Sequence, residues 1–327
     1  MRGLKISISL IALLVIVYFL GPQPQKPDFN YTLPAIADST NMDLYVSNIE
    51  QGHKIKPNNE AKIIWADSSH QATDYAIVYL HGFSASQMEG APVHENIAKQ
   101  FHCNLYLARL AEHGIDTTEE MMNLTAENYW ESAKQAYAIG KKLGKKVILM
   151  STSTGGTLSL QLAAAYPEIA GLIMYSPNIE IYNPTAPLLN DHWGLQIARI
   201  VMKGNYMNIP FTNPEYPKYW NTHYRLEGTI ALQNLVEATM NKALFKKISQ
   251  PVLTLYYFKD EARQDNVVKV GATQKMFAEI STPDSLKVLK AMPETGNHVL
   301  ASPILSKDIA GVEKETALFI ASKIIKK

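Results

Sequence analysis

One serine in this sequence stands where its hydroxyl could act as a nucleophile. The apolar run Val147–Met150 stops at small and hydroxylated residues, and an amphipathic stretch follows at once. This succession predicts a buried strand, a very tight turn and a helix. The turn has the pattern small-x-Ser-x-Gly, and Ser153 is its central residue. We expect its backbone to be strained and its side chain to point out of the edge of the sheet.

The residues around Ser153 must be small, because a larger side chain would collide with the facing backbone. Gly155 and Gly156 meet this requirement after the serine, and Ser151 stands where glycine is the usual residue. Ser151 itself is not the candidate, because Leu149 would then occupy the first tight position. We therefore predict that Ser153 is the nucleophile.

A serine hydroxyl needs a base within hydrogen-bond distance, because it is a poor nucleophile at neutral pH. His298 follows the last predicted strand, Ser285–Ala291, so its loop lies at the carboxyl edge of the sheet, where Ser153 is expected to emerge. The loop that carries His113 also opens on this edge, whereas His81 belongs to a turn and the other histidines lack a comparable position. We predict that His298 is the base.

The base needs a carboxylate to orient it, and two aspartates follow the predicted strand Pro251–Tyr257. Asp260 lies three residues past the strand, which is the usual distance. Asp265 precedes the sequence NVV, and two valines commonly follow such an aspartate. The intervening EARQ reads as a lengthened loop. We prefer Asp260, because the acid must stay near a fixed strand end, and Asp265 is the alternative.

A second turn could supply hydrogen-bond donors to a negatively charged oxygen. The continuous apolar run Ala76–Leu80 predicts a strand that is covered on both faces, and the sequence HGFS follows it. Gly82 allows the backbone to turn closely enough to aim an N–H into a pocket. In an acyl-transfer enzyme, the N–H groups of Phe83 and Thr154 would hold the oxyanion. The other interpretation is an ordinary strand-to-loop turn.

Predicted strands and helices alternate along most of the chain. Strands are expected at 61–66, 76–80, 101–110, 147–150, 171–177, 251–257 and 285–291, and helices around 42–51, 125–144, 196–203, 230–245 and 312–325. Gly144 is expected to cap the second of these helices. This alternation predicts an α/β fold with a mostly parallel, doubly wound sheet.

The alternation breaks at about 178–247, where Tyr, Trp and Pro are frequent. An insertion of this kind between two strands is expected to form a cap over the carboxyl edge of the sheet. Its apolar residues either line a pocket for an acyl chain or pack the cap onto the core; they include Leu188, Leu189, Trp193, Ile200 and Met202.

The order Ser153, Asp260, His298, with the segments YLHGFSAS, STSTGG, YFKD and GNHV, resembles the α/β-hydrolase family. The resemblance is greatest to its monoacylglycerol-lipase and lysophospholipase-like branch and covers roughly residues 60–325. It implies an eight-stranded sheet, a helical cap after the sixth strand and hydrolysis of carboxylic esters without a cofactor. Ser151 in place of glycine and the lengthened loop after Asp260 depart from the family pattern.

Composition excludes several other classes of partner. Lys and Arg total 31 and Asp and Glu total 30, so the net charge is +1 and no field of one sign is available to hold nucleic acid. Cys103, the single cysteine, lies in an apolar run and excludes an intramolecular disulfide and a thiolate metal site. No closely spaced set of His or carboxylate ligands is present in the sequence, so we expect neither a metal nor a cofactor.

The N-terminal residues 1–21 predict a membrane anchor or a secretory signal, because a short basic start precedes the apolar run Ile6–Leu20. As a helix this run spans about 22 Å, short of a bilayer core of roughly 30 Å. The positions after it lack the small residues of a cleavage site, which favours an uncleaved anchor. Arg2 and Lys5 would then stay cytoplasmic and place the rest at the extracytoplasmic face of the inner membrane; a secreted or periplasmic protein is the alternative.

Residues 22–40 contain four prolines and predict an extended linker before a hydrolase domain over 41–327. Together these features predict a membrane-tethered serine hydrolase that cleaves a carboxylic ester, such as a lipid or lysolipid, through an acyl-enzyme. A thioesterase or a peptidase would need the same residues, so the sequence does not separate these activities. A non-catalytic binding protein with this fold would be expected to lack part of the triad.

Overall fold

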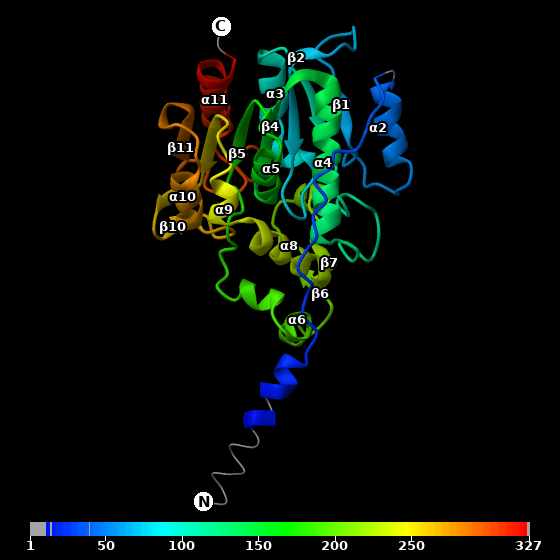
Figure 1. Ribbon diagram of the computed structural model, residues 1–327, viewed down its shortest axis with the longest axis vertical. Coiled ribbons are helices and arrows are strands. Elements are labelled where there is room, and N and C mark those ends of the chain that lie inside the picture. Colours follow the sequence, from blue (N-terminus) through cyan, green and yellow to red (C-terminus); the bar gives the residue numbers. More distant parts are fainter. Residues whose placement is uncertain (1–10, 14, 39, 326–327) are drawn as a thin grey trace, which may run out of the picture.

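The centre of the structure is a seven-stranded sheet, described by a computed structural model over residues 11–13, 15–38 and 40–325 (Figure 1). The strands lie in the order β1-β3-β2-β4-β5-β8-β11, and every neighbouring pair is parallel except β1 and β3 at one edge. The strands are β1 (Lys62–Ile64), β2 (Thr73–Leu80), β3 (Asn104–Leu107), β4 (Gly144–Thr152), β5 (Gly171–Tyr175), β8 (Val252–Tyr256) and β11 (Lys287–Ala291).

The doubly wound α/β fold predicted from the sequence is confirmed, but the strand number differs from the family expectation. Within the described residues the central sheet has seven strands and not eight. The cap therefore follows the fifth of these strands, β5, and not the sixth. Its place in the chain, between β5 and β8, is the place where the alternation of strands and helices breaks in the sequence.

Helices cover both faces of the sheet, and β2 shows how one strand serves both layers. Ala76, Val78 and Leu80 face a core closed by α4 (Ala126–Leu143) and α5 (Thr154–Ala165). The alternating residues Ile77 and Tyr79 face a second core, closed by α3 and α11. Every one of these five side chains is fully buried, which is why the run is apolar without interruption. The remaining helices around the sheet are α2 (Met42–Glu50), α3 (Val93–Gln100), α10 (Val270–Glu279) and α11 (Ile309–Phe319), with short turns at η1 (Gln87–Gly90), η3 (Asp284–Leu286) and η4 (Ile320–Ile324).

Helix α4 begins where the sequence predicted but passes into β4 without a loop. The Thr125 hydroxyl accepts a hydrogen bond from the Asn128 N–H at 3.1 Å, and the Asn128 side chain accepts one from the Thr125 N–H at 2.9 Å. The prediction that Gly144 caps the helix is confirmed, because its N–H donates to the Gly140 carbonyl; its φ of −157° is extended, and it is also the first residue of β4. A Cβ on Gly144 would lie 2.4 Å from the Ala76 nitrogen, so close strand pairing is what requires glycine here.

The cap lies beyond the carboxyl edge of the sheet, at the lower end of the view in Figure 1. Its longest helix, α8, packs Leu235 and Ala231 against the α4 and α5 layer. Helix α6 lies at the outer end of the cap, with Ile200 and Val201 exposed. The cap elements are η2 (Ala186–Asn190), α6 (Gly194–Met202), β6 (Tyr206–Asn208), α7 (Tyr216–Tyr219), β7 (His223–Arg225), α8 (Leu226–Thr239) and α9 (Lys242–Phe245).

The segment over residues 22–38 is extended and runs along the body of the protein. The indole N–H of Trp130 donates to the Asn30 carbonyl at 2.7 Å, and the Lys134 ammonium donates to the Thr32 carbonyl at 2.8 Å. Nearer the cap, the Asn234 amide donates to the Gln25 carbonyl at 2.9 Å. The backbone of this segment therefore accepts hydrogen bonds from neighbouring elements, α4 and α8 among them, in place of a sheet or helix of its own.

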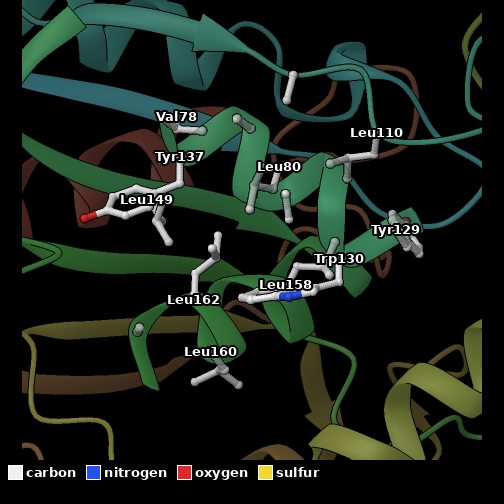
Figure 2. Close-up of a cluster of buried hydrophobic side chains, with 14 of the residues drawn as sticks. Val78, Leu80, Leu110, Tyr129, Trp130, Tyr137, Leu149, Leu158, Leu160 and Leu162 are labelled. Atoms are coloured by element: carbon white, nitrogen blue, oxygen red, sulfur yellow. The ribbon is translucent and has the colours of Figure 1, made fainter. Parts of the chain in front are cut away.

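The largest core is built around α4 and α5, and Figure 2 shows their side chains meeting those of β2 and β4. Trp130 on α4 is fully buried in it. Replacing Trp130 by Ala leaves a cavity and removes the hydrogen bond to Asn30, so we expect the free energy of unfolding to fall by about 3–5 kcal/mol. Urea unfolding followed by circular dichroism measures this change.

The matched control is Leu318→Ala on α11, because Leu318 is an exposed apolar residue. We expect this change to alter the free energy of unfolding by less than about 0.5 kcal/mol. Equal losses in the two variants would contradict the assignment of Trp130 to the core.

Candidate active site

Ser153 lies between β4 and α5 in a strained conformation, with φ of 53° and ψ of −118°. Its N–H donates to the Tyr175 carbonyl at 2.9 Å and its carbonyl accepts from the Gly156 and Asn178 N–H groups, so both sides of the residue are held. Such a conformation persists only where the surrounding structure enforces it, and it is found at functional sites more than elsewhere.

The predicted need for small residues around this turn is visible in the packing. A Cβ on Gly155 would lie 2.0 Å from the Leu80 carbonyl oxygen, and a Cβ on Gly156 would lie 2.6 Å from Pro177. Ser151 is fully buried within β4, and its hydroxyl is 3.4 Å from the Ile173 carbonyl. Its side chain is therefore part of the sheet, and Ser153 is the serine at the strand end.

Ser153 and His298 line the same cavity, which has a volume of about 790 Å³. His298 lies on the loop after β11, and residues of the cap close the opposite wall. The sequence placed these two side chains at one edge of the sheet, and the structure brings them to one cavity from segments 145 residues apart in the chain. The wall is largely apolar and includes Ile209, Phe211, Tyr216, Trp220, Leu232 and Val299.

The carboxylate beside His298 is that of Asp265. The distance from its Oδ2 to His298 Nδ1 is 2.6 Å, and its Oδ1 accepts from the N–H groups of Val267 and Val268 at 2.8 and 3.0 Å. Burial alone would raise the pKa of Asp265, but His298 and these two N–H groups outweigh it and hold the pKa below its usual value. Burial alone would lower the pKa of His298, and the carboxylates of Asp265 and Glu89 reverse this and raise it.

Asp260, the acid preferred from the sequence, does not reach His298. It pairs with Arg263, whose Nε donates to it at 2.8 Å, and two-fifths of its side-chain surface is exposed. The reason is a hairpin: β9 (Phe258–Asp260) and β10 (Arg263–Gln264) leave the end of β8 and return to it. The Asp265 N–H then donates to the Tyr257 carbonyl at 3.1 Å, so Asp265 is the aspartate fixed at the strand end.

Two backbone N–H groups beside Ser153 are free to hold an oxyanion. Among the described residues, neither the N–H of Phe83 nor that of Thr154 donates a hydrogen bond to another group of the protein. Phe83 and Thr154 both line the cavity, and Thr154 is the first residue of α5, where a helix leaves its N–H groups unpaired. The arrangement matches the expectation from the sequence, and the role itself is a proposal.

Two buried histidines hold the loop that carries Phe83 by hydrogen bonds, and this role was not predicted from the sequence. His81 Nε2 accepts from the Leu110 N–H at 3.1 Å, so its Nδ1 carries the proton and donates to the Gly82 carbonyl at 2.9 Å. His113 Nε2 accepts from the Ser84 N–H at 3.1 Å. Burial lowers the pKa of His81 to about 4 and holds that of His113 well below its usual value, so both imidazoles are neutral. His113 thus acts through its contacts and not as the base.

The apolar cap residues singled out from the sequence do not line the cavity. The lining residues of the cap are Asn178 and Ile181 at its start and residues of the stretch 209–232, whereas Ile200 on α6 is exposed at the outer end and Trp193 contacts the N-terminal segment. The sequence pattern did not distinguish the apolar cap residues that line the cavity from those that do not. Within the described ranges, no group of three or more His, Cys, Asp or Glu side chains is placed to hold a metal ion.

Comparisons with known proteins agree on this fold. The family model described as serine aminopeptidase, S33, matches residues 126–295. A thermostable monoacylglycerol lipase from Bacillus sp. (strain H-257) is 25% identical over 209 residues, which are 64% of this chain and 77% of that lipase.

Solved structures with the same fold include a metagenome-derived lipolytic enzyme, with a TM-score of 0.65 at 17% identity over 82% of this chain and 99% of that one. The monoacylglycerol lipase of Paleococcus ferrophilus has a TM-score of 0.59 at 15% identity over 80% and 97% of the two chains. The monoglyceride lipase of Saccharomyces cerevisiae has a TM-score of 0.58 at 13% identity over 82% and 92%.

The two aspartates make a matched pair for testing which carboxylate orients His298. We expect Asp265→Asn to lower kcat by about four orders of magnitude, which is the cost of losing the orienting carboxylate in a serine protease. Asp260→Asn should leave kcat within about threefold, because an exposed ion pair contributes under about 1 kcal/mol. Initial rates on a p-nitrophenyl ester measure both. A larger loss in Asp260→Asn than in Asp265→Asn would reverse the assignment.

Proposed function

This chain belongs to the serine aminopeptidase S33 family of α/β-hydrolases, and we propose that it hydrolyses carboxylic esters through an acyl-enzyme on Ser153. It is a serine hydrolase of the lipase and esterase type. The observation that carries the proposal is that Ser153 and His298 line one cavity and that the buried Asp265 contacts His298. Two N–H groups in the same cavity have no acceptor among the described residues.

The geometry supports a two-step acyl transfer. Asp265 accepts the Nδ1 proton of His298, so Nε2 is left to take the proton of Ser153 as its oxygen attacks the ester carbonyl. The carbonyl oxygen becomes negative and is held by the N–H groups of Phe83 and Thr154. His298 then gives its proton to the departing alcohol. Water repeats the sequence on the acyl-enzyme and releases the carboxylic acid.

The cavity favours an ester with an extended apolar acyl chain. Its wall is formed largely by aromatic and aliphatic side chains, and such walls bind apolar groups by removing them from water. Lipases of monoacylglycerol are among the similar proteins. We therefore propose a monoacyl lipid or lysolipid as the substrate class. A thioester or an aminoacyl amide would use the same machinery, so these two are the alternative substrates.

A fluorophosphonate probe and a substrate panel test this proposal. We expect the probe to label the protein and Ser153→Ala to abolish both the labelling and the hydrolysis. On a panel of p-nitrophenyl esters, 1-monoacylglycerols, acyl-CoA and aminoacyl amides, kcat/KM should be highest for the esters and should rise with acyl length. Labelling that persists in Ser153→Ala would refute the nucleophile. Faster turnover of the thioesters or amides would replace the ester assignment.

We also propose that the N-terminal segment and the cap contact a lipid surface. In the described part of the segment, residues 11–13 and 15–19 are helical, and Phe19 and Leu20 are 64% and 78% exposed. Residues 6–10 and 14 of the predicted apolar run lie outside the described residues. Among the described helices, none has both the length and the hydropathy needed to cross a bilayer.

The contacts between the segment and the cap support this proposal. The Trp193 indole N–H donates to the Val17 and Tyr18 carbonyls, each at 3.1 Å, and the Trp193 N–H donates to the Pro22 carbonyl at 2.8 Å. The segment therefore lies next to α6, on which Ile200 and Val201 are 76% and 70% exposed. Exposed apolar side chains on two neighbouring helices are typical of interfacial contact with lipid. The extracytoplasmic face of the inner membrane is the proposed location, and a secreted or periplasmic form is the alternative.

Sedimentation of the full chain with phosphatidylcholine–phosphatidylglycerol vesicles tests the lipid contact. We expect the double variant Ile200→Ser, Val201→Ser to weaken partitioning about tenfold or more, because two aliphatic side chains lose their transfer free energy. Hydrolysis of a water-soluble ester should be unchanged, since neither residue lines the cavity. Leu318→Ser, on α11 outside the cap, is the control and should partition like the unaltered protein. Equal partitioning of all three proteins would contradict contact through α6.

A further inference from the structure

Glu89 is a buried carboxyl group in the wall of the active-site cavity, and the acyl-transfer steps above make no use of it. It lies in η1, and only 2% of its surface is exposed. A buried carboxyl is costly unless its charge is matched by hydrogen bonds or an opposite charge. Its surroundings therefore indicate what it does.

The Glu89 side chain holds the backbone beside the nucleophile. Its Oε2 accepts a hydrogen bond from the Gly82 N–H at 2.6 Å. A Cβ on Gly82 would lie 2.9 Å from Ser153 Cβ and 3.1 Å from each Glu89 carboxyl oxygen, so serine and carboxyl flank the same glycine. The η1 turn is itself fixed, because the His94 Nε2–H donates to the Gln87 carbonyl at 2.9 Å and the Glu89 N–H donates to the Ser86 carbonyl.

Three successive amides in this loop have different partners. The Gly82 N–H donates to Glu89, and the Ser84 N–H donates to His113 Nε2. Between them, the Phe83 N–H has no acceptor among the described residues. Since the amides on both sides are tied to buried side chains, the orientation of the middle one is set before any substrate binds. Glu89 and His113 are the two anchors of the unpaired donor.

The charges that face Glu89 are few. The imidazole of His298 favours the ionised carboxylate, as does the Trp220 indole, and Glu89 in turn favours the protonated imidazole. The other titratable groups that sense its charge are the phenols of Tyr79 on β2, Tyr129 on α4 and Tyr216 on α7, and all three are neutral near pH 7. Burial raises the pKa of Glu89 to about 7, so the charge state of this carboxyl changes in the range where His298 works.

We propose that Glu89 is a positioning residue of the oxyanion site, which it orients through the Gly82 N–H, and that its negative charge supports the protonated form of His298 during acylation. This inference rests on the proposed function. No proton moves to or from Glu89 in the step: Ser153 Oγ forms the bond to the carbonyl carbon, the proton goes to His298 Nε2, and the carboxylate faces the cation so formed. Asp265 stabilises that cation through Nδ1, and Glu89 in its ionised form adds a second negative charge.

Two substitutions separate the positioning part from the charge part. Glu89→Gln keeps an oxygen that can accept from the Gly82 N–H but removes the charge. Because Glu89 raises the pKa of His298, its removal should move the acid limb of the kcat/KM profile to lower pH, where the base stays neutral. Glu89→Ala removes the acceptor as well. It should lower kcat by a further factor of about 10–100 with KM nearly unchanged, because a misdirected oxyanion donor weakens only the transition state.

The control is Glu294→Gln, which removes an exposed carboxylate from the loop that leads to His298. An exposed charge is screened by water and salt, so the pH profile should not move. Thermal unfolding of each variant confirms that it is folded, and Glu89→Gln tests the charge even where Glu89→Ala does not fold.

An unchanged acid limb in Glu89→Gln, with normal labelling of Ser153, would overturn the charge role. A kcat in folded Glu89→Ala equal to that of Glu89→Gln would overturn the positioning role. Absence of fluorophosphonate labelling in the unaltered protein is a different result, which would remove the proposed function itself.

Discussion

The strained backbone at Ser153 is the constraint on which the rest of the site depends. A residue with positive φ between a parallel strand and a helix can persist only if the neighbouring chain leaves no space for relaxation. Here the Leu80 carbonyl approaches so closely that Gly155 has no alternative, and the Tyr175 carbonyl holds the serine N–H. The fold thus uses close contact between β2, β4, β5 and the start of α5 to present one hydroxyl to the cavity. The unpaired N–H of Thr154 follows from the same turn, because the first residue of a helix has no intrahelical acceptor.

The histidines around this turn differ in the direction of their pKa shifts. His81 and His113 are deeply buried and pair with no carboxylate in the described part of the chain, so they stay neutral and hold the loop by hydrogen bonds. His298 is also buried, but the negative charges of Asp265 and Glu89 raise its pKa, so its protonated form is accessible. Histidine therefore occurs in this site both as a neutral hydrogen-bonding group and as a group that can be protonated. The neighbouring negative charge causes this difference in pKa, and not the degree of burial.

Much of the site could be predicted from the sequence because its signals are local. The tight turn at Ser153, the free amide after Gly82 and the loop position of His298 each follow from a strand end and the few residues beyond it. The carboxylate that contacts His298 could not be found in this way. Counting residues from the end of β8 selects Asp260, whereas the chain between the strand and Asp265 folds back on itself as β9 and β10. The carboxylate beside His298 does lie at a fixed strand end, as required. The number of residues between the strand and the aspartate did not show which aspartate lies there.

Other features depended on contacts that the sequence pattern does not encode. The cap was recognisable from the break in alternation, yet helical spacing did not show that α6 faces outward while residues after β6 line the cavity. Glu89 gave no signal, because a single glutamate in a polar loop is ordinary until its burial and its bond to Gly82 are known. The extent of the sheet was likewise open, since the family expectation of eight strands exceeds the seven found in the described residues.

The extended segment after the N-terminal helix has a mechanical consequence. It is attached to the cap at Asn190 and Trp193 and to the sheet layer at Trp130 and Lys134, so it spans the junction between the two. Any movement of the cap away from the sheet would stretch this segment or break its hydrogen bonds at one of the attachment points. The segment therefore resists separation of the cap from the sheet, and a pull on the N-terminal end reaches the cap at Asn190 and Trp193 before it reaches the turn at Ser153.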